Sequence, residues 1–184
     1  MKQTFDNELI SVIIPIYNSK TYLKQTLDSV LNQNYEGDFN IIIVDDASTD
    51  KPEDVINLYK DNAGVIYIRL EKNVGAGEAR NVGLNFSDAR FVAFLDSDDL
   101  WKKDKLKKQM LLMKEKNAIL SYTAIDMIDS DGKIIKPKRK VPQKASYKTI
   151  LKNTLIANSS VIVDRALAGD FLISTRRMSQ DYST

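Results

Sequence analysis

The stretch RFVAFLDSDDLW, from Arg90 to Trp101, carries the two features that decide the fold. Its first half is a short, almost continuous apolar run, and its second half is a cluster of aspartates. Runs of this kind are typical of strands covered on both faces, as in a parallel sheet. Three similar runs precede it along the chain: SVIIPI (Ser11–Ile16), NIIIV (Asn40–Val44) and VIYIRL (Val65–Leu70). The sequence therefore predicts four buried strands, the last of which ends in carboxylates.

Helical patterns separate these four runs. The first carries apolar residues at Tyr22, Leu23, Leu27, Val30 and Leu31, the second spans Pro52–Tyr59, and the third presents Ala79, Val82, Gly83 and Phe86. Gly83 is expected where the third helix comes close to the sheet. Alternation of strands and helices favours right-handed βαβ units, and so an α/β fold with a doubly wound, mainly parallel sheet and helices on both faces.

The pattern loosens after Trp101. We expect a basic amphipathic helix over Lys102–Lys116 with Leu106, Met110 and Met113 on one face. A hairpin should follow, with Ile119–Ile128 turning at Asp131-Gly132 into Ile134-Ile135. The remaining expectations are a basic loop at Lys136–Lys144, a helix at Tyr147–Leu155 and a last strand at Ser160–Val163.

Composition removes several kinds of chemistry. The 184 residues suit one domain, and they include neither cysteine nor histidine. Thiol nucleophiles, zinc–thiolate sites and histidine bases are therefore excluded, and a metal would need oxygen ligands, which favours Mg²⁺, Mn²⁺ or Ca²⁺. The net charge of +2 gives no argument for a nucleic-acid partner. The first ten residues lack the apolar core of a signal peptide, so the expected location is cytoplasmic.

Five carboxylates follow two of the predicted strands. Asp45 and Asp46 end the second strand, and Asp96, Asp98 and Asp99 follow the fourth. Ligands of open α/β sheets bind beyond the carboxyl ends of the strands, where five like charges repel unless a cation or hydrogen-bond donors compensate. The alternative is that these residues cap the following helices, but capping needs one such residue per helix. We therefore predict a site for a metal and a nucleoside diphosphate.

Four motifs in order resemble the family 2 glycosyltransferases, which are inverting GT-A enzymes that use nucleotide-sugar donors. These motifs are SVIIPIYNSKTYLKQTLDSVLNQNY, IIIVDDASTD, NVGAGEARNVGL and FVAFLDSDDLW. The resemblance runs from Leu9 to Leu112. It implies that Pro15, Tyr17 and Asp46 contact the nucleoside, with Asp45 in support, and that Arg80 lies near the nucleotide.

The resemblance also assigns roles beyond the nucleoside. It implies that Asp96 lies near the ribose or donor sugar, that Asp98 binds the metal, and that Asp99 contacts donor or metal indirectly. An inverting transfer needs a base, and Asp181 is the residue that matches the family's base. Asp181 as a helix cap is the alternative. The chain ends at Thr184, where the family continues, so we expect one catalytic domain, incomplete on its acceptor side, with the nucleotide-sugar half at about 9–112 and the acceptor-side half at about 119–184.

The expected donor is a UDP-sugar, and the expected acceptor is a glycan or lipid-linked glycan in cell-surface polysaccharide synthesis. The basic stretches Lys102–Lys108 and Lys136–Lys144 are expected to be solvated, with peripheral contact at the inner face of the membrane as the alternative.

Three rival functions remain. Gly75 and Gly77 suggest a dinucleotide loop, but Arg80 occupies the third glycine position. A nucleotidyltransferase would carry a glycine-rich basic loop after the first strand, but this chain has Pro15-Ile16-Tyr17-Asn18 there. A nucleotide-binding module without transfer activity is the third.

Overall fold

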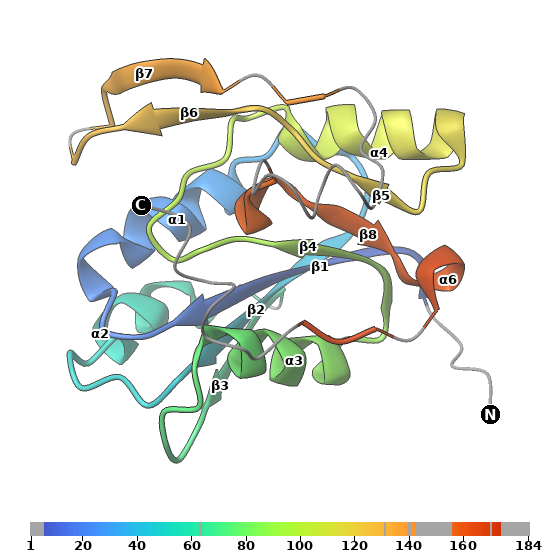
Figure 1. The fold of residues 1–184 in the computed structure, drawn as a ribbon. Coiled ribbons are helices and arrows are strands. Elements are labelled where there is room, and N and C mark those ends of the chain that lie inside the picture. Colours follow the sequence, from blue (N-terminus) through green and yellow to red (C-terminus); the bar gives the residue numbers. More distant parts are fainter. Residues whose placement is uncertain are drawn as a thin grey trace.

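A six-stranded sheet forms the centre of the molecule in the computed structural model, which describes residues 6–62, 64–130, 132–139, 141–142, 156–169 and 171–173 (Figure 1). The strand order is β3-β2-β1-β4-β8-β5. The strands are β1 (Asp6–Ile16), β2 (Phe39–Asp45), β3 (Val65–Arg69), β4 (Ala89–Phe94), β5 (Leu120–Ser121) and β8 (Ile162–Asp164). A separate two-stranded sheet consists of β6 (Ile125–Ile128) and β7 (Ile134–Arg139).

The first four strands are parallel, as predicted. β1 pairs with β2 on one side and with β4 on the other, while β3 pairs with β2. β8 runs antiparallel to both β4 and β5, so the sheet is mixed at that edge. The strand order reverses beside β1, and in an open α/β sheet such a reversal is where a ligand crevice forms.

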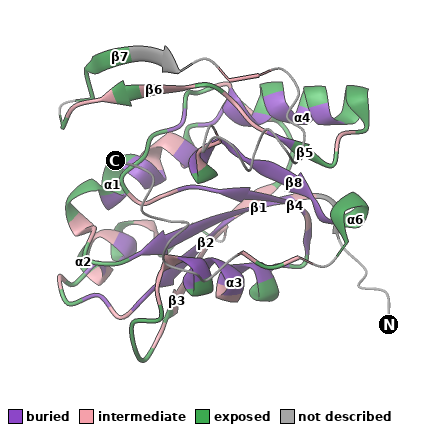
Figure 2. Cartoon of the chain, in the orientation of Figure 1, coloured by how far each residue is buried: buried purple, intermediate pink, exposed green. Residues whose placement is uncertain are grey.

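Helices cover both faces of the sheet, with α1 and α4 above it and α3 beneath it in Figure 1. One face packs against α1 (Lys20–Leu31), α2 (Glu53–Ile56), η1 (Asn57–Tyr59) and α4 (Lys105–Lys116). The other face packs against α3 (Ala76–Phe86). Successive side chains of β1 alternate between the two faces, with Val12 and Ile14 in the first cluster and Ile13 in the second. The buried colour in Figure 2 follows these strands.

Gly83 lies where α3 comes closest to the sheet. A Cβ atom at this position would stand 2.6 Å from Cγ2 of Ile13 and 3.3 Å from Cγ2 of Val44. The predicted close approach is therefore confirmed, because any side chain here would displace the helix from β1 and β2.

Several predicted boundaries were wrong. The second helix is one α-helical turn that continues as the 3₁₀ turn η1. α4 begins at Lys105 rather than Lys102, with Leu106, Met110 and Met113 buried as predicted. Phe86 is exposed, because the close packing of α3 brings Leu84 among the sheet residues instead.

The region after α4 also differs from the prediction. Leu120 and Ser121 belong to the main sheet as β5, paired with β8, so only Ile125 onward forms the hairpin. Part of the predicted loop, residues 136–139, is strand, because β7 pairs with β6 as far as Arg139. β8 begins at Ile162, after the 3₁₀ turn η2 (Asn158–Ser160), and it leads into α6 (Arg165–Ala168). The predicted helix at Tyr147–Leu155 lies outside the described residues.

Among the helices that the structure describes, none is long and apolar enough to cross a membrane.

Candidate functional site

The carboxyl ends of β1, β2 and β4 meet at one edge of the sheet. The backbone N–H of Asp46 donates to the Ile16 carbonyl at 2.9 Å, and the N–H of Leu95 donates to the Ile13 carbonyl at 3.1 Å. The segments that follow β2 and β4 are therefore both held against the end of β1. This edge coincides with the reversal of strand order, so the predicted site residues of these strands lie where a ligand crevice is expected.

Asp45 is part of the scaffold of this edge. Its carboxylate is fully buried, and it accepts hydrogen bonds from the Tyr67 hydroxyl at 2.7 Å, from Nη1 of Arg69 at 2.6 Å and from the Ser48 backbone N–H at 2.8 Å. Arg69 also donates to Glu53 at 2.8 Å. Asp45 thus joins β2 to β3 and closes the loop after β2.

The pKa of the Tyr67 hydroxyl is raised by this environment. Burial is the main cause, and the hydrogen bond to Asp45 adds to it, because both disfavour a phenolate beside a carboxylate. Tyr67 therefore stays a neutral donor to Asp45 at physiological pH.

Asp46 holds a second loop. One carboxylate oxygen accepts from the Val74 N–H at 2.6 Å and the other from the Gly75 N–H at 2.8 Å. Gly75 has a φ of 91°, which favours glycine, and it immediately precedes α3. Asp46 is 2% exposed. Its carboxylate therefore positions the entry to α3, and the nucleoside contact predicted for it would have to use the remaining lone pairs.

Tyr17 stands at the open end of β1. It is 52% exposed, whereas Pro15 is buried within β1, paired in register with Val44. The next residue, Asn18, ties the loop after β1 to the loop after β2, because its side-chain oxygen accepts from the Thr49 N–H at 2.8 Å and its N–H donates to Ser48 at 3.0 Å. The ring of Tyr17 is thus available to a ligand on a fixed loop, while Pro15 contributes packing.

Arg80 and Asp96 form the central ion pair of the site. Nη2 of Arg80 lies 2.5 Å from Oδ1 of Asp96, so α3 is joined directly to the end of β4. The Arg80 side chain is 6% exposed, and its Nε has no hydrogen-bond partner among the described residues. The Asp96 side chain is 38% exposed. The pair therefore places one cation under the acidic loop and leaves Asp96 open on one side.

Asp98 and Asp99 complete the acidic loop. Asp98 is exposed, and its carboxylate has no partner among the described residues. Partial burial of the Asp99 carboxyl raises its pKa, the neighbouring Asp96 and Asp98 raise it further, and a hydrogen bond with Ser159 acts in the opposite direction. Asp99 keeps exposed surface as a whole residue, so this burial concerns its carboxyl end. Negative charge thus accumulates here without a protein cation opposite Asp98, within the described part of the chain.

Two residues that were not predicted from the sequence brace this loop. The Thr26 hydroxyl on α1 donates to the Ser97 carbonyl at 2.8 Å and lies 3.1 Å from the Asp99 carbonyl. Ser159 on η2 accepts from the Asp96 N–H at 3.0 Å, and its carbonyl accepts from the Trp101 indole at 2.8 Å. No local signal marks Thr26 or Ser159, because they lie 71 and 63 residues from their partners.

Arg69 is a third residue that was not predicted, and it braces Asp45 instead of the acidic loop. A signal for it did exist, since Arg69 stands opposite Asp45 in the parallel register of β2 and β3. Once two neighbouring strands are aligned, a basic residue opposite a strand-end aspartate predicts an ion pair.

The structure fits a divalent cation held jointly with a ligand. Within the described residues no three acidic side chains are grouped closely enough to hold a metal alone. Mg²⁺ in nucleotide sites is commonly bound through one or two carboxylates together with phosphate oxygens and water. Asp98, with Asp99 beside it, offers that kind of partial ligand set. A cation here would also relieve the repulsion that raises the pKa of Asp99.

The five carboxylates do not all face one point. Arg69 and Arg80 compensate Asp45 and Asp96, and backbone N–H groups compensate Asp46, as the contacts above describe, whereas Asp98 and Asp99 have no cationic partner among the described residues. The metal site was predicted from repulsion among five carboxylates, and that argument therefore overstated the number of uncompensated charges. Asp181 lies outside the described residues.

A family model described as "Glycosyl transferase family 2" matches residues 11–174 of this chain. The chain is 40% identical over 177 residues to TuaG of Bacillus subtilis (strain 168), named as a putative teichuronic acid biosynthesis glycosyltransferase, with 96% of this chain and 70% of TuaG covered. It is 34% identical to the Escherichia coli β-1,3-glucosyltransferase WfgD, named for UDP-Glc and a GlcNAc-diphosphoundecaprenol, with 90% of this chain and 64% of WfgD covered.

Solved structures have the same fold. Residues 1–349 of S. aureus TarS in complex with UDP superpose with a TM-score of 0.74 at 27% identity, over 90% of this chain and 50% of that one. A mannosyltransferase of Pyrobaculum calidifontis, in complex with GDP-Man and Mn²⁺, gives a TM-score of 0.68 at 18% identity, over 92% of this chain and 48% of that one. This chain thus spans between 48% and 70% of the length of these proteins. The predicted GT-A-type fold is confirmed.

Proposed function

Because the chain belongs to glycosyl transferase family 2, we propose that it moves a sugar from a nucleoside-diphosphate donor to an acceptor hydroxyl with inversion. UDP-sugar is the proposed donor, since UDP is the ligand of the TarS structure and UDP-Glc is named for WfgD. The observation that carries the proposal is the acidic loop after β4, braced from three elements, with Asp98 open and Arg80 beneath it.

Different residues around the loop are proposed to contact different parts of the donor. Tyr17 offers an exposed ring against which a base can stack, and Asp46 borders the same edge. Arg80 supplies positive charge near the nucleotide, and Asp96, which it orients, accepts hydrogen bonds from sugar or ribose hydroxyls. We assign the nucleotide to the part of the chain up to about residue 112 and the acceptor to the part from about 119.

Mg²⁺ or Mn²⁺ is the proposed cofactor, with Asp98 as its protein ligand and Asp99 in support. With the cation bound, negative charge on the departing diphosphate would be neutralised. Inversion requires a base on the opposite face of the sugar from the leaving group, and Asp181 remains our proposal for it. Histidine and cysteine are absent from these 184 residues, so a base that lies among them must be of another residue type.

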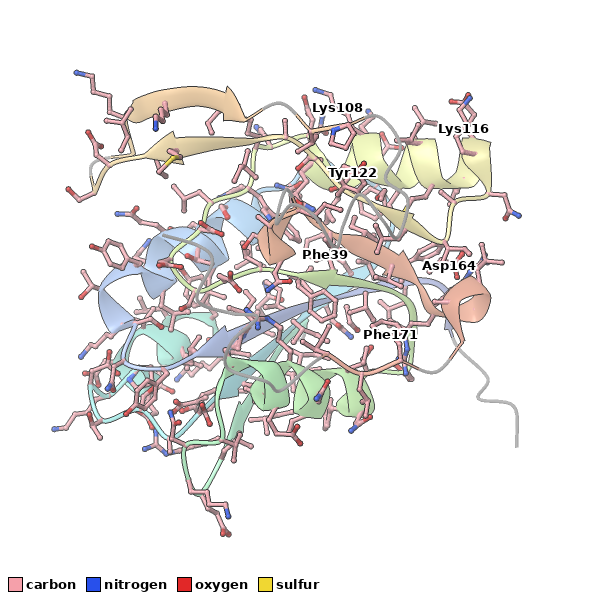
Figure 3. The ribbon with its side chains drawn as sticks, in the orientation of Figure 1. Phe39, Lys108, Lys116, Tyr122, Asp164 and Phe171 are labelled. Atoms are coloured by element: carbon pink, nitrogen blue, oxygen red, sulfur yellow. The ribbon has the colours of Figure 1, made fainter. Side chains whose placement is uncertain are left out.

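The acceptor is proposed to be a glycan or lipid-linked glycan used in cell-surface polysaccharide synthesis, as the names of TuaG and WfgD suggest. We propose that the chain works in the cytoplasm, in peripheral contact with the membrane's inner face. The outer face of α4 supports this, because Leu111 and Leu112 are exposed there beside Lys107 and Lys108. Figure 3 shows Lys108 and Lys116 on this side of α4.

Calorimetric titration with UDP tests the donor site. Saturable binding is expected with Mn²⁺ and not with EDTA. Asp98→Asn should abolish the metal-dependent part while the fold stays intact, because Asp98 is exposed and packs in neither core cluster. Asp88→Asn is the matched control, since Asp88 is exposed at the opposite end of β4. Unchanged Mn²⁺-dependent affinity in Asp98→Asn would reject the metal assignment.

The rival function is a nucleotide-binding module without transfer. UDP binding without sugar transfer or donor hydrolysis, in a chain extended past Thr184, would favour the module. Retained transfer in Asp181→Asn of that longer chain would place the base elsewhere.

A further inference from the structure

A cavity of about 200 Å³ opens beside the acidic loop, between α1 and the β6–β7 hairpin. One wall is Tyr22 and Gln25 of α1, the floor includes Asp98 and Leu100, and the other wall is the end of β6 with the turn that follows it. Both α1 residues are exposed, and at a spacing of three they share one side of the helix. The cavity is smaller than the roughly 300–1,000 Å³ of pockets for drug-sized ligands, so it suits a single small ring.

The walls of this cavity are held by contacts within the protein. Asp129 organises the hairpin turn, since its carboxylate accepts from the Lys133 N–H at 2.9 Å and its N–H donates to the Lys133 carbonyl at 3.0 Å. An ion pair between Lys102 and Asp126 fastens β6 to the segment before α4. Thr26, on the next position of α1 after Gln25, holds the acidic loop. The cavity is therefore a defined feature between three fixed segments.

The position of the cavity separates it from the residues proposed to bind the nucleotide. α1 packs on one face of the sheet, whereas α3, which carries Arg80, packs on the other. Among the predicted donor and metal residues, only Asp98 lines the cavity. The cavity thus adjoins the donor site on the side away from Arg80, and its hairpin wall belongs to the half of the chain assigned to the acceptor.

The lining has the chemistry that recognises a saccharide. The amide of Gln25 and the hydroxyl of Tyr22 have no partner among the described residues, so both can bond to sugar hydroxyls. Leu100 and Ile128 provide apolar surface for the C–H face of a ring. Two carboxylates, Asp98 and Asp129, also line the cavity, and no lysine or arginine stands among its described lining residues. An anionic sugar would meet repulsion there.

We propose that this cavity is a subsite for an uncharged pyranose of the acceptor. The proposal rests on the proposed function, because it identifies the ligand as the acceptor by its place beside the donor site. Gln25 then serves as a specificity residue that bonds to acceptor hydroxyls. Asp129, together with Asp98 when no cation is bound there, selects against uronic acids.

Ligand-observed NMR titration of the whole chain tests this, with methyl β-D-glucopyranoside and methyl β-D-glucopyranosiduronate as probes. The titrations are run with and without UDP and Mn²⁺. We expect saturable binding of the neutral glucoside and, in the titrations without Mn²⁺, at least about tenfold weaker binding of the glucuronide, since one unpaired charge costs more than one neutral hydrogen bond. Gln25→Ala should weaken glucoside binding about threefold to tenfold, the loss of one to two hydrogen bonds, and leave UDP affinity unchanged.

Asn85→Ala is the matched control, because Asn85 is an exposed amide on α3, on the other face of the sheet. Equal glucoside binding by wild type and Gln25→Ala, or no saturable binding by wild type, overturns the subsite whether or not UDP binds. Equal binding of the two probes in the absence of Mn²⁺ overturns the selection by charge. UDP could fail to bind while the glucoside still binds and Gln25→Ala still weakens its binding. That result overturns the proposed donor site and leaves the acceptor subsite in place.

Discussion

Replacing Asp45 by Asn should lower stability while leaving nucleotide binding largely unchanged. The carboxylate accepts three hydrogen bonds, and an amide keeps only the one from the Ser48 N–H. The new NH₂ group would face the Arg69 guanidinium, which can only donate, and the Tyr67 hydroxyl, which could accept from it only by turning its own proton away. Two hydrogen bonds to a charged acceptor are lost, at about 1.5–3 kcal/mol each.

The net cost is smaller than that sum. Arg69 is 44% exposed, so water can solvate it, and it keeps its contacts with Glu53 and the Ser48 carbonyl. Tyr67 also lies 3.3 Å from Glu53. We therefore expect a loss of roughly 2–3 kcal/mol in the free energy of unfolding, because exposed partners of a charge recover part of its solvation. For a chain of this size each kcal/mol corresponds to about 2–4 °C in Tm.

Urea and thermal unfolding measure the loss, and UDP titration well below the Tm measures binding. Asp46→Asn is the comparison, because Asp46 holds the loop before α3 that borders the nucleotide edge, and it should weaken UDP binding more than Asp45→Asn does. An Asp45→Asn protein of wild-type stability would refute the scaffold role. So would a folded Asp45→Asn protein that has lost UDP binding.

Three further predictions concern the helices. Gly83→Ala should cost about 1–3 kcal/mol in urea unfolding, because its Cβ overpacks against Ile13, and a stabilised variant would contradict the close approach. Burial lowers the pKa of Lys105 to about 7, its Nζ lying 4.0 Å from the Trp101 ring. The folded chain then binds fewer protons than the unfolded chain above pH 7, so stability should rise by roughly 2 kcal/mol between about pH 7 and 9. Lys105→Met should remove that slope, and an equal slope in the variant would exclude Lys105 as its source. In co-sedimentation, the chain should bind to vesicles that contain anionic lipid and not to zwitterionic vesicles. Leu111→Ser and Lys107→Glu should each reduce the amount of protein bound. Equal sedimentation with both vesicle types would reject the charge-based contact.

The parallel part of the fold was predictable because its signals are local. Four apolar runs identified the four parallel strands, and helical spacing between and after these runs identified α1, α3 and α4. Gly83 was identified as a close approach from its place on a helix face. The antiparallel edge was not predictable in the same way, since β5 and β8 are short and meet only through tertiary packing, which pairs Leu120 with the distant Val163.

The candidate site could be located from the sequence, but its internal arrangement could not. The acidic residues after β2 and β4 were predicted to meet at one edge of the sheet, and the structure brings these strand ends together beside β1. Which of them is neutralised depends on partners elsewhere in the chain: Arg69 lies 24 residues from Asp45, and Arg80 lies 16 residues from Asp96. A pattern of aspartates cannot show where those cations will lie.

This distribution of partners bears on how a cation would bind. Arg69 and Arg80 satisfy Asp45 and Asp96, and backbone amides satisfy Asp46, so the protein itself presents Asp98 and Asp99 as its principal free carboxylates at this edge, within the described residues. One or two carboxylates bind Mg²⁺ or Mn²⁺ weakly unless phosphate oxygens complete the coordination. Metal and nucleotide should therefore bind cooperatively, each raising the affinity of the other by the same factor. Calorimetric titration of Mn²⁺ into the chain, with and without UDP, measures that factor, and equal Mn²⁺ affinity in the two titrations would mean that the protein holds the cation without the diphosphate.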